Sequence, residues 1–89
     1  MEKAREAEKI LKALANRRRL SIVKYLRRIN RSTPTNISQE IKLSIKATSK
    51  HLGVLAAAEL VEREQHGLRI DYFLAEPLHK ITRSALDSV

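Results

Sequence analysis

Histidines, carboxylates and hydroxyls are the side chains that could carry catalysis or hold a metal in this sequence, which has no cysteine. The histidines His51, His66 and His79 lie too far apart to form a helical pair of ligands, whereas a tetrahedral metal site needs four nitrogen, sulfur or oxygen ligands. Ser49 and His51 are two residues apart, so on a helix they point to different sides and cannot act together as nucleophile and base. We therefore expect no catalytic residue, no cofactor, no metal ligand and no enzyme activity.

Lysines and arginines are the second informative set of side chains, and their chemistry is the binding of anions. The 18 basic residues outnumber the 10 acidic ones, so the chain has a formal net charge of +8 and an isoelectric point near 10.3. The excess is concentrated in residues 1–31. A chain this basic favours polyanions, nucleic acid first and anionic membrane second. A solvated basic surface is the alternative, and it becomes weaker if the basic residues share one recognisable surface.

Length and composition restrict the kind of protein further. Eighty-nine residues predict one domain spanning residues 1–89, and the many leucines, isoleucines and valines favour a folded core. No apolar run approaches the roughly 18 residues that span a bilayer. The charged N-terminus has no apolar signal segment behind it, so we expect a cytoplasmic protein. Two glycines are too few for a phosphate-cradling loop or a Rossmann turn.

Hydrophobic periodicity predicts helices over the first two thirds of the chain. Apolar stripes occur over residues 2–14 and 17–29: Ala4, Ala7, Ile10, Leu11 and Leu14 in the first, Leu20, Val23, Leu26 and Ile29 in the second. Asn16 caps the second helix, and residues 30–33 form a polar loop. Thr33 and Pro34 open a short third helix with Ile37 and Ile41 inward. Ser44 caps a fourth helix that runs to about residue 58.

The period changes to two after the fourth helix. Residues 68–74 alternate as a half-buried strand does, with Leu68, Ile70, Tyr72 and Leu74 inward. Residues 61–65 pair back with them across a turn at His66-Gly67, and Pro77 opens a final helix over residues 78–89. The predicted fold class is mainly α with a small β-hairpin, in the order α-α-α-α-β-β-α.

Two helices joined by a tight turn and followed directly by a hairpin form a winged helix-turn-helix, whose second helix can enter the DNA major groove. On this recognition helix, about residues 44–58, the inward positions are Thr48, Leu52 and Leu55. The opposite face is short or basic: Lys46, Ala47, Ser49, Lys50 and Gly53. We predict that this face binds DNA, and that His51 packs or contacts a phosphate. A solvated face that carries two lysines is the alternative.

The hairpin adds a second basic surface. Arg63, His66 and Arg69 lie on or near its predicted tip, from which arginine can reach a phosphate or the adjacent minor groove. Solvation is the alternative, and Glu62 and Glu64 weaken the DNA-binding interpretation because they repel phosphates.

Three consecutive arginines open the second helix, where the helix dipole is unfavourable for cations. We expect Arg19 to bond internally and Arg17 and Arg18 to be solvated, with phosphate contact as the alternative. Arg27, Arg28 and Arg31 are likewise expected to be solvated, with phosphate contact as their alternative.

The stretch from Ile10 to Leu74 resembles the ArsR/SmtB-type family of small dimeric winged-helix repressors. The matching pieces are ILKALANRRRLSIVKYL, LSIKATSKHLGVLAAAELV and RIDYFLA. The second piece is the most specific, with Ser49-Lys50-His51-Leu52 followed by Val54-Leu55 and Leu60-Val61. The resemblance implies a homodimer built on the first and last helices, which binds an imperfect palindrome and represses transcription.

The sequence departs from that family at two turns and at the sensor sites. Family members often have glycine where this sequence has Lys42 and Glu59, at which a positive φ is unfavourable, so we expect these turns to differ in detail. The cysteine-rich site of the family would fall near residues 36–40, which are Asn-Ile-Ser-Gln-Glu. Its site on the last helix needs a carboxylate where Pro77 stands, two residues before His79. Neither metal site is carried over.

Helices 2–14 and 78–89 have apolar stripes on a chain too small to bury all of them. We predict that they form the dimer interface, with packing inside one chain as the alternative. A two-fold dimer places its two recognition helices about one DNA turn, ~34 Å, apart.

These inferences predict a homodimeric, sequence-specific DNA-binding transcriptional regulator that acts as a repressor, with double-stranded DNA and itself as partners. Its recognition helix lies in the major groove, and its wing, about residues 61–74, lies on the DNA backbone or in the minor groove. The alternatives are a winged-helix protein-interaction module and a nonspecific architectural nucleic-acid binder within a larger complex.

Overall fold

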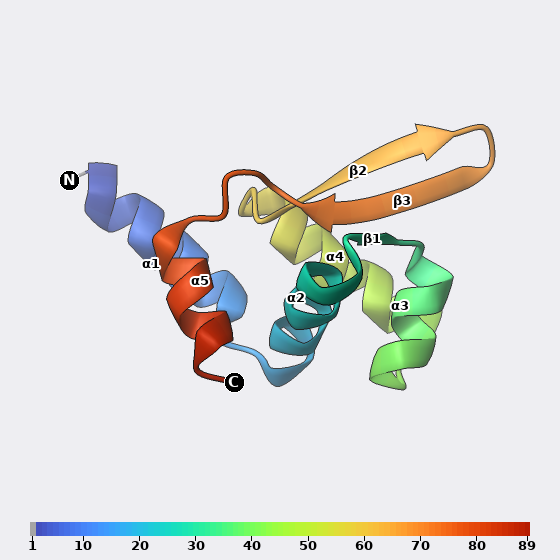
Figure 1. Cartoon of the computed structure of the whole chain (residues 1–89), viewed down its shortest axis with the longest axis horizontal. Helices are drawn as coiled ribbons and strands as arrows, with labels where there is room; N and C mark the ends of the chain where they lie inside the picture. The colour runs from blue at the N-terminus through green and yellow to red at the C-terminus, as the bar shows by residue number, and fades with distance from the viewer. Residues whose placement is uncertain (1) are drawn as a thin grey trace.

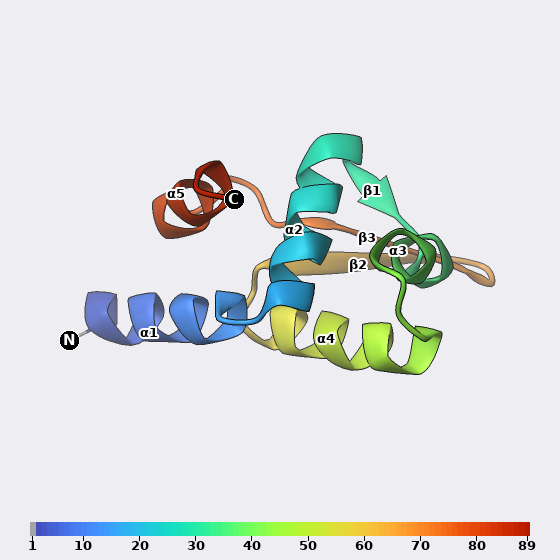
Figure 2. The same ribbon diagram turned by 90° about the horizontal axis from the view of Figure 1, so that it is seen from below.

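The computed structural model describes residues 2–89 as five helices and a three-stranded sheet (Figure 1). In chain order the elements are α1 (Glu2–Leu14), α2 (Arg17–Ile29), β1 (Arg31–Ser32), α3 (Pro34–Ile41), α4 (Ile45–Ala57), β2 (Val61–His66), β3 (Arg69–Leu74) and α5 (Lys80–Asp87). Figure 2 shows α1 and α4 along one side of the molecule, α5 on the other side, and α2 between them. The predicted fold class, mainly α with a β-hairpin, is confirmed.

Short polar side chains define where three of the helices begin, because they accept from backbone N–H groups that have no partner within the helix. Asn16 accepts from two such groups at the start of α2, at 2.9 and 3.1 Å. Thr33 and Ser44 each accept from one group at the start of α3 and α4, at 3.2 and 3.1 Å. Pro34 lies in the first turn of α3, where its missing N–H costs nothing. All three predicted caps are confirmed.

The core lies where α2 contacts every other helix and the sheet. Ile22, Leu26, Ile37, Leu52 and Leu55 are fully buried in it. Ile22 is absent from the predicted stripe of its helix, because a helix packed on several sides buries a wider arc than a surface helix does.

The predicted stripe of α1 is only partly correct. Ile10 and Leu14 are buried, whereas Ala4 is exposed and Leu11 leaves 54% of its surface exposed. The reason is that α1 packs on α2, α4 and α5 along one side only. An apolar side chain therefore remains uncovered on this helix.

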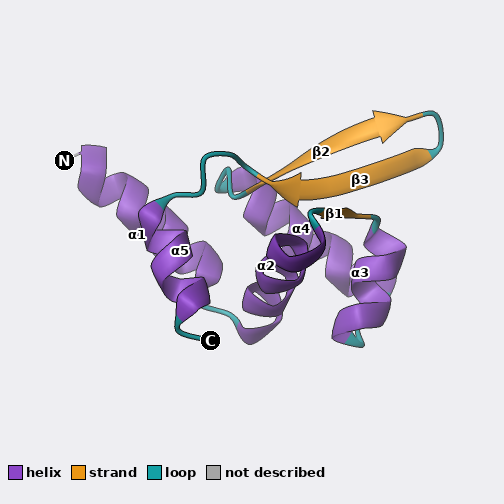
Figure 3. Ribbon diagram, viewed as in Figure 1, coloured by secondary structure: helices purple, strands orange, loops and turns teal. Residues whose placement is uncertain are grey.

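The central strand of the sheet is β3, which pairs antiparallel with β1 on one edge and β2 on the other (Figure 3). The predicted polar loop at residues 30–33 is wrong in part, because Arg31 and Ser32 form β1 and pair with Phe73 and Tyr72. A strand of two residues is too short to show a periodic pattern in the sequence. Its pairing with β3 is a contact between distant residues and depends on the folded structure.

The hairpin turn is Gly67-Leu68 and not the predicted His66-Gly67, because His66 still pairs with Arg69. Gly67 has a φ of 62°, and glycine at the first position of a two-residue loop suits a type II′ turn. Leu68 therefore lies beyond the sheet and is 103% exposed, which corrects its predicted inward position.

The turns after α3 and α4 keep the left-handed geometry that glycine favours, which corrects the expectation that they would differ. Lys42 has a φ of 57° and Glu59 a φ of 61°. Each turn is held by a hydrogen bond that closes the preceding helix, from Leu43 N–H to Ser38 O and from Leu60 N–H to Leu55 O, both at 3.0 Å. These are the bonds of a Schellman motif, and they offset the strain of a left-handed lysine or glutamate.

The last helix begins at Lys80, later than the predicted start just after Pro77. His79 is its N-cap, since its backbone is extended and its Nδ1 accepts from the Ile81 N–H at 3.0 Å. Leu78 therefore belongs to the connecting segment, although it still packs on the core.

Candidate nucleic-acid interface

A helix-turn-helix is formed by α3 and α4, which pack against each other across a short turn, and the β2–β3 wing follows α4 directly (Figure 1). The inner face of α4 is anchored by Thr48, Leu52 and Leu55, all fully buried as predicted. Lys46 and Lys50 are exposed on the outside of this helix, one turn apart. The fold thus presents two lysines from a rigid element.

Short residues surround these lysines. Ser49 and Gly53 are exposed, and a Cβ added to Gly53 would meet no atom within 4 Å. The internal packing of the protein therefore does not require a glycine there. What its missing side chain does provide is room for another molecule to approach the helix backbone closely.

Two other predicted site residues, Ala47 and His51, are half-buried. Arg19 Nη1 and His51 Nδ1 lie 3.3 Å apart. Because the guanidinium has donors but no acceptor, Arg19 donates this hydrogen bond to the imidazole. Burial lowers the pKa of His51, and the charges of Arg19 and Arg18 lower it further. The imidazole is thus neutral at neutral pH and contributes no charge to the surface.

The wing residues differ in their exposure and in whether their side chains already have partners within the protein. Arg63 is exposed and lies on the sheet face of Val61, whereas Arg69 donates from Nε to both carboxylate oxygens of Asp71, at 3.0 and 3.3 Å. Asp71 is only 4% exposed, which corrects its predicted outward position. His66, near the tip, pairs with Glu64 at 2.7 Å.

Arg31 organises the outer face of the wing, a role that the sequence did not reveal. Its guanidinium lies 3.1 Å from Glu64, 3.7 Å from Asp71 and 4.8 Å from the centre of the Phe73 ring. Hydrogen bonds from His66 and then Arg31 lower the pKa of Glu64. Glu64 and Asp71 are therefore paired with neighbouring cations, whereas Glu62 on the same face is exposed and forms no ion pair within residues 2–89. Arg31 is exposed, as expected, and β1 also places it beside the wing, where it forms these pairs.

The arginines that open α2 bond to the ends of neighbouring helices. Arg19 Nε donates to Ala13 O of α1 at 2.6 Å, so its predicted internal bonding is confirmed. Arg18 is exposed, as expected, but it also donates to Ile41 O of α3 at 2.7 Å. Arg17 is exposed, as expected.

The arginines at the other end of α2 are exposed, as expected, and they also form ion pairs. Arg27 pairs with Asp87 of α5 at 2.8 Å, and Arg28 with Glu40 of α3 at 3.6 Å. These pairs join α2 to α5 and to the helix-turn-helix.

Within residues 2–89, no three histidine, aspartate or glutamate side chains come close enough together to hold a metal ion. No helix in the same range is long and apolar enough to cross a membrane.

The fold and the basic outer face of α4 define a winged helix-turn-helix DNA-binding protein. The family model described as "Bacterial regulatory protein, arsR family" matches residues 16–63, more than half of the chain. The chain belongs to the arsR family of bacterial regulatory proteins and is a DNA-binding transcriptional regulator. This family and fold are those of regulators and not of enzymes.

Several solved structures are similar over nearly the whole chain. HlyU from Vibrio cholerae is 28% identical, with 97% of this chain and 89% of that chain covered and a TM-score of 0.83. The transcriptional repressor PagR of Bacillus anthracis is 27% identical, with coverages of 94% and 97% and a TM-score of 0.82. A homodimeric winged helix-turn-helix DNA-binding domain from Mycobacterium bovis is 25% identical, with coverages of 96% and 75% and a TM-score of 0.79. No curated protein sequence matches the chain.

Proposed function

We propose that this protein is a homodimeric repressor that reads a specific DNA sequence by placing α4 in the major groove and the wing on the backbone or in the minor groove. The observation that carries the proposal is the outer face of α4. Lys46, Ser49 and Lys50 are exposed there, and Gly53 leaves room for another molecule to approach the helix backbone. Lysine can donate to a guanine edge or to a phosphate, and serine can contact either. The family and the repressor activity of the similar PagR support the same function.

The proposed DNA-binding residues are Lys46, Ala47, Ser49, Lys50, His51, Arg63 and Arg69. Exposure supports the direct contacts of Lys46, Ser49, Lys50 and Arg63. Ala47 and His51 are half-buried and are proposed to shape the edge of the surface. Arg69 is proposed to reach a phosphate with the guanidinium nitrogens that its bond to Asp71, through Nε, leaves free.

The dimer is proposed to form through α1 and α5. These helices pack together, and a groove between them is lined by Leu11, Ile81 and Ala85 with short or basic side chains at its edge. An apolar groove of this kind on a small domain is a natural surface for a two-fold partner. The homodimeric domain from Mycobacterium bovis supports dimer formation.

Two further features belong to the proposal. Residues 1–89 work as one domain, because a single core includes Ile10 of α1 and Leu86 of α5. A regulator that binds the bacterial chromosome works in the cytoplasm.

The test is DNA binding by Lys50→Ala over a series of salt concentrations, on a duplex selected from genomic fragments and on a random duplex. If Lys50 reads a guanine edge, the variant should lose about 1–3 kcal/mol on the selected duplex and much less on the random one. If it contacts only a phosphate, the loss should be equal on both, and the salt slope should fall by about one unit. Lys24→Ala removes an exposed lysine from α2, outside the proposed DNA and dimer surfaces, and serves as the matched control. Binding by Lys50→Ala that equals the wild type on both duplexes would contradict the proposal.

A further inference from the structure

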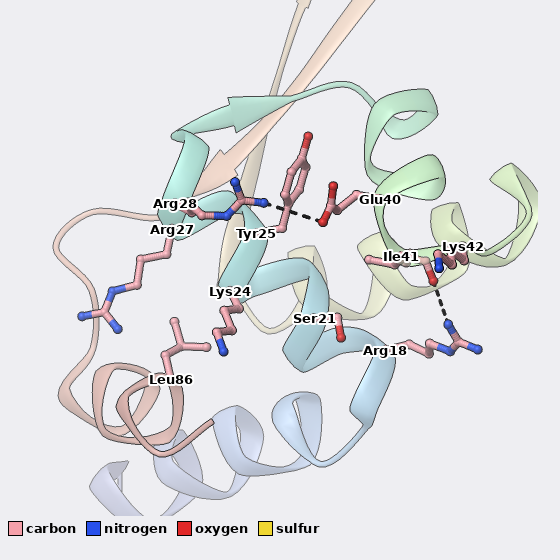
Figure 4. A pocket seen from close by; sticks show the side chains of 10 residues that line it. All are labelled: Arg18, Ser21, Lys24, Tyr25, Arg27, Arg28, Glu40, Ile41, Lys42 and Leu86. Carbon is pink, nitrogen blue, oxygen red and sulfur yellow. Dashed lines mark hydrogen bonds and ion pairs between the residues drawn. The ribbon is translucent and has the colours of Figure 1, made fainter.

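A basic cavity of about 730 Å³ lies between α2, the end of α3 and α5 (Figure 4). This volume is within the range of small-molecule sites, roughly 300–1,000 Å³. Five of the lining side chains are cationic and one is acidic: Arg18, Lys24, Arg27, Arg28, Lys42 and Glu40. The lining therefore has a net charge of +4, or +3 once the ion pair of Arg27 with Asp87 is counted, which favours a ligand with more than one negative charge.

The cavity also has an apolar and aromatic part. Ile41 and Leu86 are buried and contribute apolar surface, and Tyr25 contributes its ring. The guanidinium of Arg28 lies 5.4 Å from the centre of that ring. An arginine that stacks on an aromatic ring keeps its N–H groups directed sideways, where they can bind a phosphate in a bidentate manner.

The cavity is separate from the proposed DNA surface. No lining residue comes from α4 or from the wing, and α2 lies between α4 and α5 (Figure 2). Within residues 2–89, the Lys42 amine takes part in no hydrogen bond or ion pair. Arg28 pairs with Glu40 at 3.6 Å, but its side chain is 65% exposed, so N–H groups of its guanidinium remain for an anion beside the Lys42 amine.

We propose that this cavity binds a phosphorylated small molecule of about the size of a nucleotide. Arg28 and Lys42 hold the phosphates, and the half-buried Tyr25 contacts the planar or apolar part of the ligand. Arg27 and Arg28 have carboxylate partners, whereas Arg18, Lys24 and Lys42 form no ion pair within residues 2–89. Two or more phosphate charges match these three cations better than the one charge of a carboxylate does. The proposal goes beyond DNA binding and does not depend on it.

The experiment is calorimetric titration of the full chain with adenosine 5′-diphosphate, without DNA. We expect saturable binding of one molecule per chain. Adenosine lacks the charge and inorganic pyrophosphate lacks the planar part, so each should bind at least about tenfold more weakly. No saturable binding of the diphosphate below about 1 mM would overturn the proposal. Equally tight binding of pyrophosphate would overturn the role of Tyr25.

Two matched double variants locate the site, because each removes two positive charges. Arg28→Gln with Lys42→Gln should weaken diphosphate binding by about tenfold or more. Lys46→Gln with Lys50→Gln, on the outer face of α4, should leave it within about twofold and should instead weaken DNA binding. Equal losses in both variants would mean general attraction to a basic protein and would overturn the site.

A single variant guards against misfolding. Lys42→Gln removes an amine without internal partners, so its thermal unfolding should match the wild type while its diphosphate affinity falls about threefold. Unchanged affinity in this folded variant would overturn the assignment of Lys42.

Discussion

Arg18 and Arg19 lie in the first turn of α2, where the positive end of the helix dipole disfavours cations. Their side chains reach the C-terminal carbonyls of α3 and α1, at 2.7 and 2.6 Å, and the negative end of a helix favours cations. A position that is unfavourable within its own helix thus becomes favourable between helices. These two arginines join three helices around the start of α2.

His51 offers a pH test of that arrangement. Burial and the nearby arginines lower its pKa in the folded protein, so the unfolded chain binds more protons as the pH falls through the ordinary value of 6.5. The contribution of His51 to the free energy of unfolding should therefore be fully present above pH 6.5 and should be lost as the pH falls toward the lower folded pKa. Thermal unfolding between pH of about 8 and about 5 should show a smaller decrease for His51→Gln than for the wild type. Parallel curves would contradict this assignment of the imidazole.

Arg69 has a structural role that differs from its proposed phosphate contact. It provides the closest cation to the carboxylate of Asp71, which is 4% exposed, and Arg31 lies farther away at 3.7 Å. Arg69→Ala should therefore lower the free energy of unfolding by about 1–2 kcal/mol, because Asp71 loses a hydrogen-bonded partner in a buried position.

Chemical denaturation measures this change. The effect of Arg69→Ala should shrink when it is combined with Asp71→Asn, since the variant amide has no charge to leave uncompensated. Stability equal to the wild type would contradict the structural role of Arg69.

At the scale of the elements, the two left-handed turns are the places where sequence and backbone geometry disagree. Lys42 and Glu59 occupy positions that suit glycine, and closing hydrogen bonds hold both turns. Glu59 also pairs with Lys9 of α1 at 2.9 Å, which lowers its pKa and links the end of α4 to α1. The strain at this turn is accompanied by a specific contact between elements.

The turn at Lys42 can be tested by substitution. The left-handed conformation costs a residue with a Cβ roughly 1–2 kcal/mol of steric strain. Glycine avoids this strain but loses more conformational entropy on folding, which costs about 0.5–1 kcal/mol. Lys42→Gly should therefore stabilise the fold by up to about 1 kcal/mol. Lys42→Ala, which removes the amine but keeps the Cβ, should give no gain. A melting temperature of Lys42→Gly at or below that of Lys42→Ala would contradict the strain.

At the scale of the whole molecule, two surfaces remain for partners. The outer face of α4 is basic, whereas the groove of Leu11, Ile81 and Ala85 between α1 and α5 is apolar. Figure 1 shows α1 and α5 at the opposite end of the molecule from α3 and the tip of the wing. The proposed DNA surface and the proposed dimer surface therefore lie on different elements of the molecule.

Charging the groove should separate the proposed dimer. Leu11→Asp or Ile81→Asp would bury an unpaired carboxylate in the interface, which costs several kcal/mol. Sedimentation equilibrium should then give a monomer of 10.2 kDa. Leu68→Asp, at the exposed wing tip, is the control and should leave the dimer intact. A wild type that is monomeric at micromolar concentration, or a groove variant that remains dimeric, would contradict the interface.

The sequence by itself determined the parts that depend on neighbouring residues. The caps Asn16, Thr33 and Ser44 and the hydrophobic period place the helices, because both act within one or two turns. The inward residues of α4 followed from the same period, and with them the exposed face that carries Lys46 and Lys50. Membership of the arsR family followed from the motifs that these elements contain.

The tertiary structure alone decided what depends on residues far apart in the chain. Arg31 meets Glu64 across 33 positions, and Arg18 reaches Ile41 across 23. The cavity near Tyr25 exists only because α2, α3 and α5 converge. No local pattern encodes such contacts, since a charged side chain looks solvated until the fold places a partner beside it. The uncovered Leu11 has the same cause, because burial is a property of the packed elements and not of a stripe on one helix.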